Sequence, residues 1–190
     1  LQEAGLHVVL FEARARLGLP PTDPVVLFVG GSDGSGPLLR TVRAVGGQMQ
    51  KAACSRVVVT GRNQRLRRRL RALDAPTLRV EGFVPEMALW MRAADVLVTK
   101  AGPNTLAEAF ITGCPLVLYD AIPGQERGNV RYVVNRGAGL WRPQPRAAAR
   151  SVSALLADPA QRLALADRAR ALAQPQATAR IAGLVRALIG

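Results

Sequence analysis

The residues best suited to chemistry lie in two polar segments on either side of an apolar run. The first segment, residues 99–105, holds a lysine, a glycine, a proline and an asparagine directly after a run of β-branched residues. A turn between a strand and a helix aims backbone N–H groups and the positive helix end at one point, which suits a phosphate. We therefore predict a phosphate site at Gly102, Asn104 and Thr105, with Asn104 as the N-cap of the helix. Lys100 adds a cation there that a strand end does not otherwise need.

The second segment, residues 122–129, brings two amides and a carboxylate together in Gln125, Glu126 and Asn129. Such groups bind hydroxyls, although they also suit capping of a helix that begins there, and for Asn129 this alternative is strong. Glu108 lies one helical turn after Asn104, where its carboxylate could accept hydrogen bonds from a ribose diol or complement the helix end. A diphosphate site beside a hydroxyl site predicts a nucleotide sugar as the ligand.

Two further loops extend this prediction. Residues 30–36 form a glycine-rich turn after a strand, but they lack the Gly-Lys-Ser/Thr ending of a Walker loop and the G-x-G-x-x-G spacing of dinucleotide folds. Gly30, Gly31 and Ser32 carry little side-chain bulk, so phosphate or sugar can approach the backbone, although a plain tight turn is the alternative. Phe83 follows another strand and could lie beside a base, with packing in the core as an equal alternative.

The elements that position these loops alternate between strand and helix patterns, which predicts an α/β fold with a doubly wound, Rossmann-like parallel sheet of about six strands. We expect residues 24–190 to form this domain and residues 1–23 to be a linker or the remnant of a preceding region. The chain lacks a starting Met, so we expect it to be a piece of a longer protein. The expected strands are 24–30, 56–60, 77–80, 95–99, 115–119 and 139–141. The expected helices are 37–54, 63–73 (capped by Asn63), 85–94, 104–112 and 125–136, followed by helices from 146 that break near 158–159 and 175.

The composition and net charge of the chain limit the kinds of molecule that it is expected to bind. The 26 Lys and Arg against 13 Asp and Glu leave a net charge of +13, which favours nucleic acid, acidic lipid or a phosphorylated substrate. Arginines are concentrated in residues 62–71. The simplest interpretation is a basic helix face exposed to solvent, and the more specific hypothesis is contact with anionic lipid. Aromatic residues make up only 4%, so the chain has few side chains on which nucleic acid bases could stack, which argues against nucleic acid as the partner.

Other classes of site find little support in the sequence. Cys54 and Cys114 are too few for a disulfide framework and are expected to be buried thiols. The single His7 has no cluster of cysteines or carboxylates near it, so we predict no metal site and no cofactor. No apolar run reaches the ~18 residues of a membrane span, and the start of the chain does not resemble a signal peptide.

Several motifs, in this order, are similar to one glycosyltransferase family. Thr99-Lys100-Ala101-Gly102-Pro103, Thr105-x-Ala107-Glu108-Ala109, Gly113-x-Pro115 and residues 122–129 resemble the C-terminal half of monogalactosyldiacylglycerol synthases and related processive diacylglycerol glucosyltransferases. The peptidoglycan N-acetylglucosaminyltransferase of the same family is a more remote match. Residues 29–31, 34–38, 60–63 (with Gly61 and Arg62) and 82–84 also fit the family pattern. Two positions depart from it, because Asn104 replaces an expected Gly and Ser32-Asp33 replaces Gly-Glu.

The resemblance implies the C-terminal half of a GT-B fold, which binds a UDP-sugar. It places the diphosphate at Gly30, Gly31 and Ser32 and at the helix that starts at Asn104 and Thr105. Phe83 and Val84 would flank uracil, Glu108 would take the ribose hydroxyls, and Gln125 and Glu126 would hold the donor hexose. Lys100 would act electrostatically.

From the resemblance we expect the UDP-hexose-binding half of an inverting transferase that moves galactose or glucose to diacylglycerol. The catalytic base and the acceptor site would belong to an N-terminal half, without which this chain would be inactive. The protein would be cytoplasmic and peripheral at an anionic membrane surface. The alternatives are a UDP-N-acetylglucosamine transferase domain with another acceptor, and a non-catalytic module that binds nucleotides or anionic surfaces.

Overall fold

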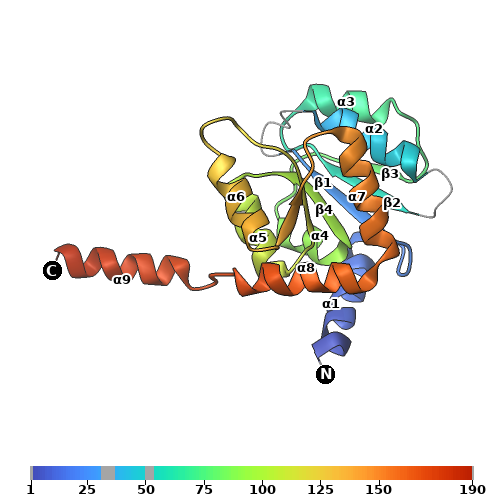
Figure 1. Cartoon of the computed structure of the whole chain (residues 1–190). Helices are drawn as coiled ribbons and strands as arrows, with labels where there is room; N and C mark the ends of the chain where they lie inside the picture. Colours follow the sequence, from blue (N-terminus) through green and yellow to red (C-terminus); the bar gives the residue numbers. More distant parts are fainter. Residues whose placement is uncertain (1, 31–36, 50–53, 190) are drawn as a thin grey trace.

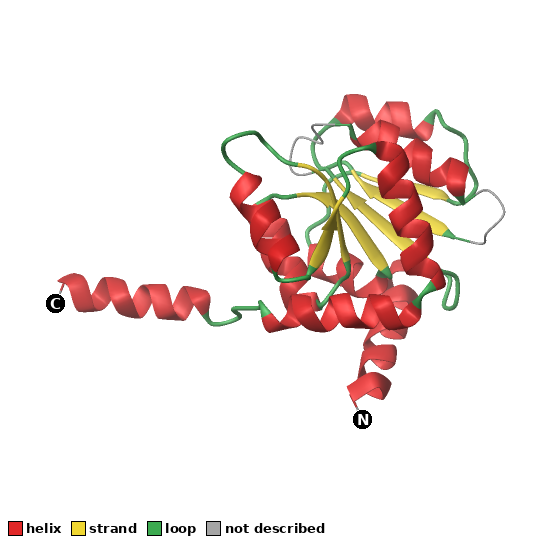
Figure 2. Cartoon of the chain, viewed as in Figure 1, coloured by secondary structure: helices red, strands yellow, loops and turns green. Residues whose placement is uncertain are grey.

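A six-stranded, fully parallel sheet forms the centre of the molecule (Figures 1 and 2). The computed structural model describes residues 2–30, 37–49 and 54–189. The sheet order is β3-β2-β1-β4-β5-β6, so β1 and β4 are neighbours and the strand order reverses between them. The strands are β1 (Val25–Val29), β2 (Ser55–Val59), β3 (Leu78–Glu81), β4 (Val96–Lys100), β5 (Leu116–Asp120) and β6 (Gly139–Trp141).

Helices cover both faces of the sheet, as the mostly apolar strands require. One core joins the sheet to α2, α3 and α7, and a second core joins its other face to α1, α4, α5 and α6. The helix α8 contributes to both cores, while α9 extends away from the body (Figure 1). The helices are α1 (Gln2–Leu17), α2 (Leu38–Gln48), α3 (Gln64–Arg71), α4 (Met87–Ala93), α5 (Pro103–Thr112), α6 (Arg127–Asn135), α7 (Pro145–Ala157), α8 (Pro159–Ala171) and α9 (Ala177–Ile189).

The predicted doubly wound sheet is confirmed, and the predicted strands match those of the structure closely. Asn63 caps α3 as predicted, because its side chain accepts a hydrogen bond from the Leu66 N–H at 2.8 Å. The expected helix over 37–54 ends earlier, at Gln48, and residues 50–53 lie outside the described residues. None of the helices in the described ranges has the length and apolarity that a membrane span requires.

The expected linker over residues 1–23 contains the helix α1, which packs against the core through Ala13. Its apolar residues follow no helical period, so the pattern of the sequence did not indicate a helix. Only residues 18–24 form the connection into β1 that we expected for the whole segment. The domain boundary at residue 24 stays a prediction.

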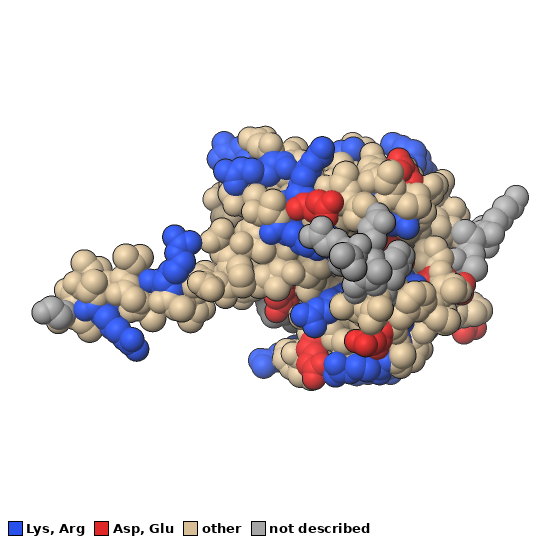
Figure 3. Space-filling view, turned by 90° about the horizontal axis from the view of Figure 1, so that it is seen from below, with Lys and Arg blue, Asp and Glu red and all other residues tan. Residues whose placement is uncertain are grey.

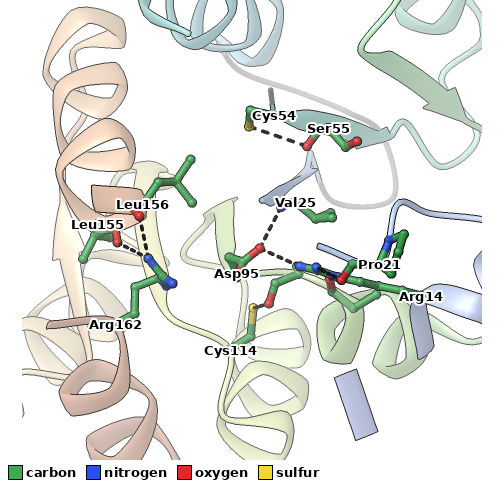
Figure 4. Close-up of polar contacts among 12 residues, drawn as sticks. Arg14, Pro21, Val25, Cys54, Ser55, Asp95, Cys114, Leu155, Leu156 and Arg162 are labelled. Atoms are coloured by element: carbon green, nitrogen blue, oxygen red, sulfur yellow. Dashed lines mark hydrogen bonds and ion pairs between the residues drawn. The ribbon is translucent and has the colours of Figure 1, made fainter. Parts of the chain in front are cut away.

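A buried ion pair joins α1 to the amino end of the sheet (Figure 4). Asp95 Oδ2 accepts hydrogen bonds from Arg14 Nη2 and from the backbone N–H of Val25, both at 2.7 Å. Arg14 also donates to the carbonyl oxygens of Ala93 at 3.1 Å and Pro21 at 2.8 Å. One guanidinium and one carboxylate therefore hold together α1, the start of β1 and the turn before β4.

Replacing Asp95 with Ala should lower the free energy of unfolding by about 3–5 kcal/mol, since it leaves the Arg14 charge buried without its partner. Arg14 exposes only 4% of its side chain. Urea denaturation followed by circular dichroism measures the change.

Arg16→Ala is the matched control, because Arg16 forms an exposed pair with Glu86. This control should cost less than about 1 kcal/mol. Equal effects of the two replacements would contradict a special role for the Arg14–Asp95 pair.

Candidate functional site

Most of the predicted site residues lie along one edge of the sheet. All six strands are parallel, so the loops that follow them open at the same carboxyl edge. The helical residues Glu108 and Asn129 lie on α5 and α6, which follow two of these loops. Gly31 and Ser32 lie outside the described residues. The loop residues in strand order are Gly30 after β1, Gly61 and Arg62 after β2, Phe83 and Val84 after β3, Lys100 and Gly102 at the end of β4, and Gln125 and Glu126 after β5.

The helix α5 begins at this edge, and its N-cap lies two residues earlier than expected. Gly102 is the N-cap and Pro103 occupies the first helical position, so the prediction of Asn104 as the N-cap is wrong. Proline suits that position because its fixed φ fits the helix and its missing N–H is not needed there. Asn104 and Thr105 follow within the first turn, where backbone N–H groups have no partner inside the helix. These two N–H groups and the positive helix end are therefore suited to an anion.

Glu126 closes the loop between β5 and α6. Only 6% of the residue is exposed, and its Oε2 accepts a hydrogen bond from the Ile122 N–H at 2.8 Å. The Glu126 N–H in turn donates to the Ile122 carbonyl at 2.9 Å. Its Oε1 lies 3.7 Å from the position that a Cβ on Gly102 would occupy, so the carboxylate also borders the start of α5. Glu126 thus shapes its own loop, while the neighbouring Gln125 is exposed.

Asn129 joins the two loops that the sequence placed at the centre of the site. Its Nδ2 donates to the carbonyl oxygen of Ala101 at 2.8 Å, while the Ala101 N–H donates to the Asp120 carbonyl at 3.0 Å. The alternative of Asn129 as the cap of α6 is wrong, since Glu126 is the N-cap residue. The roles of Ala101 and Asp120 were not predicted. Both residues take part through backbone carbonyl groups that accept from residues distant in the chain, and such contacts leave no signal in the sequence.

Glu108 lies on α5 one turn after Asn104, on the same side of the helix. It is half-buried, and burial raises the pKa of its carboxyl group above the usual range. The carboxylate therefore takes up a proton at a higher pH than an exposed glutamate does. In its ionised form it can accept two hydrogen bonds from neighbouring hydroxyls.

Phe83 is exposed over 69% of its surface, so the alternative of a core position is wrong. The guanidinium carbon of Arg62, from the loop after β2, lies 6.0 Å from the centre of the Phe83 ring. Val84 is half-buried and packs against the core, which fixes the chain next to Phe83. An exposed ring beside a guanidinium offers a planar surface on which a base can stack.

The remaining candidate groups do not form a reactive centre. Cys54 and Cys114 are buried free thiols, as predicted, and burial raises the pKa of Cys54 to about 11 and raises that of Cys114 further. Within the described residues, histidines, cysteines and carboxylates form no cluster that could hold a metal ion. Lys100 is buried at the end of β4. The arrangement therefore favours binding of a polar, anionic ligand over covalent chemistry by the chain itself.

Asn129→Ala should lower the free energy of unfolding by about 1 kcal/mol, because it removes the hydrogen bond to Ala101. Asn135→Ala, an exposed position at the end of the same helix, should change it by less than about 0.5 kcal/mol. Urea denaturation of both variants checks the difference, and a loss in Asn129→Ala no larger than in the control would contradict the joining role of Asn129.

A family model and similar relatives point to the same glycosyltransferase family. A family model described as the glycosyltransferase family 28 C-terminal domain matches residues 25–182. A probable monogalactosyldiacylglycerol synthase 2 of Oryza sativa subsp. japonica is 45% identical over 149 residues, which are 75% of this chain and 32% of that protein. Monogalactosyldiacylglycerol synthase 2 of Arabidopsis thaliana is 42% identical over 173 residues, which are 87% of this chain and 37% of that protein. The chain thus spans about a third of the length of these relatives.

Solved structures share the fold at lower identity. MurG of Acinetobacter baumannii superposes with a TM-score of 0.73 at 22% identity, over 93% of this chain and 52% of that one. The spinosyn rhamnosyltransferase SpnG, in its complex with thymidine diphosphate, superposes with a TM-score of 0.61 at 22% identity, over 89% of this chain and 46% of that one. These similarities support the fold, which is that of one half of a GT-B glycosyltransferase.

Proposed function

Because this chain belongs to the glycosyltransferase family 28 C-terminal domain family, we propose that it is the donor-binding half of a hexosyltransferase and that its ligand is a UDP-hexose. The observation that carries the proposal is that the helix start at Gly102 and the exposed ring of Phe83 both follow strands at the carboxyl edge of one sheet, with Glu108 one turn into the helix that begins there. In parallel α/β sheets this edge is where nucleotides bind.

Each part of a UDP-hexose has a complementary group along this edge. The diphosphate would accept hydrogen bonds from the N–H groups of Asn104 and Thr105, with Gly30 and Lys100 close by in the sheet. Phe83 and Val84 would flank the uracil, and Glu108 would accept hydrogen bonds from the ribose hydroxyls. Gln125, Glu126 and Asn129 would face the hexose, with Glu126 and Asn129 also holding the loops that carry these contacts.

The proposed reaction transfers galactose or glucose to the free hydroxyl of a diacylglycerol. Galactose is our first choice, because the relatives with the highest identity given above are named monogalactosyldiacylglycerol synthases. The acceptor oxygen would attack the anomeric carbon as the bond to UDP breaks, so the configuration inverts, the proton passes to a base and UDP leaves with the bonding electrons. The start of α5 and Lys100 would stabilise the negative charge that develops on UDP.

We assign the base and the acceptor site to another part of the full-length protein. The titratable groups at the described edge already have roles in binding or in loop structure, and the match covers only about a third of the length of the relatives. The chain alone would then bind the donor without transferring the sugar. In the full protein, closure of a second domain over the edge would complete the site and exclude water.

Affinity for UDP-galactose should fall as the pH falls through the raised pKa of Glu108, since protonation removes the acceptor that the ribose hydroxyls need. Glu108→Gln should bind about tenfold more weakly at pH values above that pKa, which corresponds to the loss of one charge-assisted hydrogen bond. The variant should also lose the dependence on pH that Glu108 causes. Isothermal titration calorimetry measures both effects.

Glu12→Gln on α1 is the control for this experiment, because it removes the same charge from an exposed position on another element. It should bind UDP-galactose like the unchanged chain. No saturable binding to the folded chain, or equal binding by Glu108→Gln, would contradict the donor-site proposal.

We also propose that the full protein acts peripherally at a membrane and that α3 contacts anionic lipid. Four arginines of this short helix are exposed: Arg65, Arg68, Arg69 and Arg71. Arg67 is not among them, because its guanidinium lies against Gly82. The face shown in Figure 3 carries basic side chains in several groups, with acidic side chains beside some of them. The helix α3 is our candidate for lipid contact because its four exposed arginines lie on one short helix.

Replacing Arg65, Arg68 and Arg69 together with Gln should weaken binding to vesicles that contain phosphatidylglycerol by about a hundredfold, at about 1 kcal/mol per basic residue. Vesicle sedimentation measures the change. Replacing the exposed Arg146, Arg150 and Arg180 together removes the same charge from other helices and should weaken binding much less. Equal losses would contradict a specific role for α3.

A further inference from the structure

Arg56 is a buried cation that forms no ion pair in the described part of the chain. It lies in β2, near the amino end of the strand, and only 9% of the residue is exposed. Its Nη2 donates to Thr77 Oγ1 at 2.9 Å, and its backbone N–H donates to the Thr77 carbonyl at 2.8 Å. Burial lowers the pKa of the guanidinium, as expected for a charge without a carboxylate beside it. Buried charges are normally paired, so an anion would be a suitable partner for the Arg56 guanidinium.

The helix α2 is adapted to the Arg56 guanidinium. Gly46 and Gly47 occupy its last turn, where each interior glycine costs about 0.5–1 kcal/mol relative to alanine. A Cβ on Gly46 would meet Nη1 of Arg56, so the guanidinium packs directly against the glycine in the last turn of α2. The negative carboxyl end of α2 offsets part of the charge. A partial helix charge satisfies only part of a full cation. The other N–H donors of the guanidinium have no acceptor among the described residues, and none of these atoms is fully buried, so they are open to solvent.

A hollow of about 580 Å³ opens beside this guanidinium at the amino edge of the sheet. Arg43 of α2 lines it together with Arg56, Gly46, Gly47 and Thr77. Asp74 also borders the hollow, and it forms no ion pair with either arginine in the described residues. Two arginines and a threonine thus line one open space, together with a single acidic residue.

We propose that this hollow binds a phosphate group. Guanidinium groups form paired, charge-assisted hydrogen bonds with phosphate oxygens, and Arg43 and Arg56 supply two such groups from different elements. The bound anion would join α2 to the amino ends of β2 and β3, where Arg56 and Thr77 already meet. The carboxyl ends of the same two strands lead to Arg62 and Phe83, so the site lies at the opposite edge from the proposed nucleotide site and does not depend on it.

Titration of the ¹⁵N-labelled chain with inorganic phosphate, followed by NMR, tests this site residue by residue. Phosphate should shift the amide signals of Gly46, Gly47 and Thr77 saturably, while sodium chloride at the same ionic strength should not. Arg43→Gln should weaken this affinity about tenfold, the factor that corresponds to one charge-assisted hydrogen bond. Arg43 is exposed, so its replacement leaves the fold intact.

Arg150→Gln on α7 is the matched control, since it removes the same charge from an exposed position outside the hollow. It should retain the affinity of the unchanged chain. A parallel titration with glycerol 3-phosphate shows whether the site prefers an esterified phosphate or the free ion. The ligand with the higher affinity identifies the preferred form. Shifts confined to Gly102, Asn104 and Thr105, or equal affinity in Arg43→Gln, would overturn the proposal. Failure of UDP to bind would leave this result unaffected, because the two sets of amides are separate.

Discussion

The pairing of β1 with β4 is the constraint on which the rest of the structure depends. Val26 lies opposite Val96 although the two are far apart in the chain, and this pairing makes the strand order reverse at the centre of the sheet. Asp95 fixes the amino end of this strand pair, because one carboxylate oxygen accepts from both Arg14 and the Val25 N–H. With both strands held in register, β1 leads to α2 on one face of the sheet and β4 leads to α5 on the other, which is the point where ligands bind in parallel α/β sheets.

At the carboxyl edge, the structure separates groups that hold the loops from groups that can meet a ligand. Glu126 and Asn129 hydrogen-bond to Ile122 and Ala101, so two neighbouring loops are fixed by buried or half-buried side chains. Gln125 in one of these loops and Phe83 after β3 are, in contrast, exposed. Loops that are fixed before the ligand arrives lose little conformational entropy on binding, and this preorganisation is what recognition of a nucleotide sugar needs.

The parallel sheet was predictable because its strands and most of the helices around it carry local signals. Alternating apolar runs and amphipathic segments identified the six strands, and Asn63 was predicted as a cap from its position before a helical pattern. The long-range contacts were missed because no local pattern encodes them. Asn129 reaches a carbonyl oxygen 28 residues away, and Arg14 reaches a carboxylate 81 residues away. The helix α1 was missed because its apolar residues lack a helical period, and Asn104 was misplaced because Pro103 already begins the helix.

A crystal structure of this chain with UDP tests the central claim most directly, because it shows where each part of the nucleotide lies. Our account predicts the diphosphate against the N–H groups of Asn104 and Thr105, the ribose hydroxyls on the Glu108 carboxylate and the uracil beside Phe83. UDP bound away from the start of α5, or bound there with Glu108 turned away from the ribose, would contradict the account.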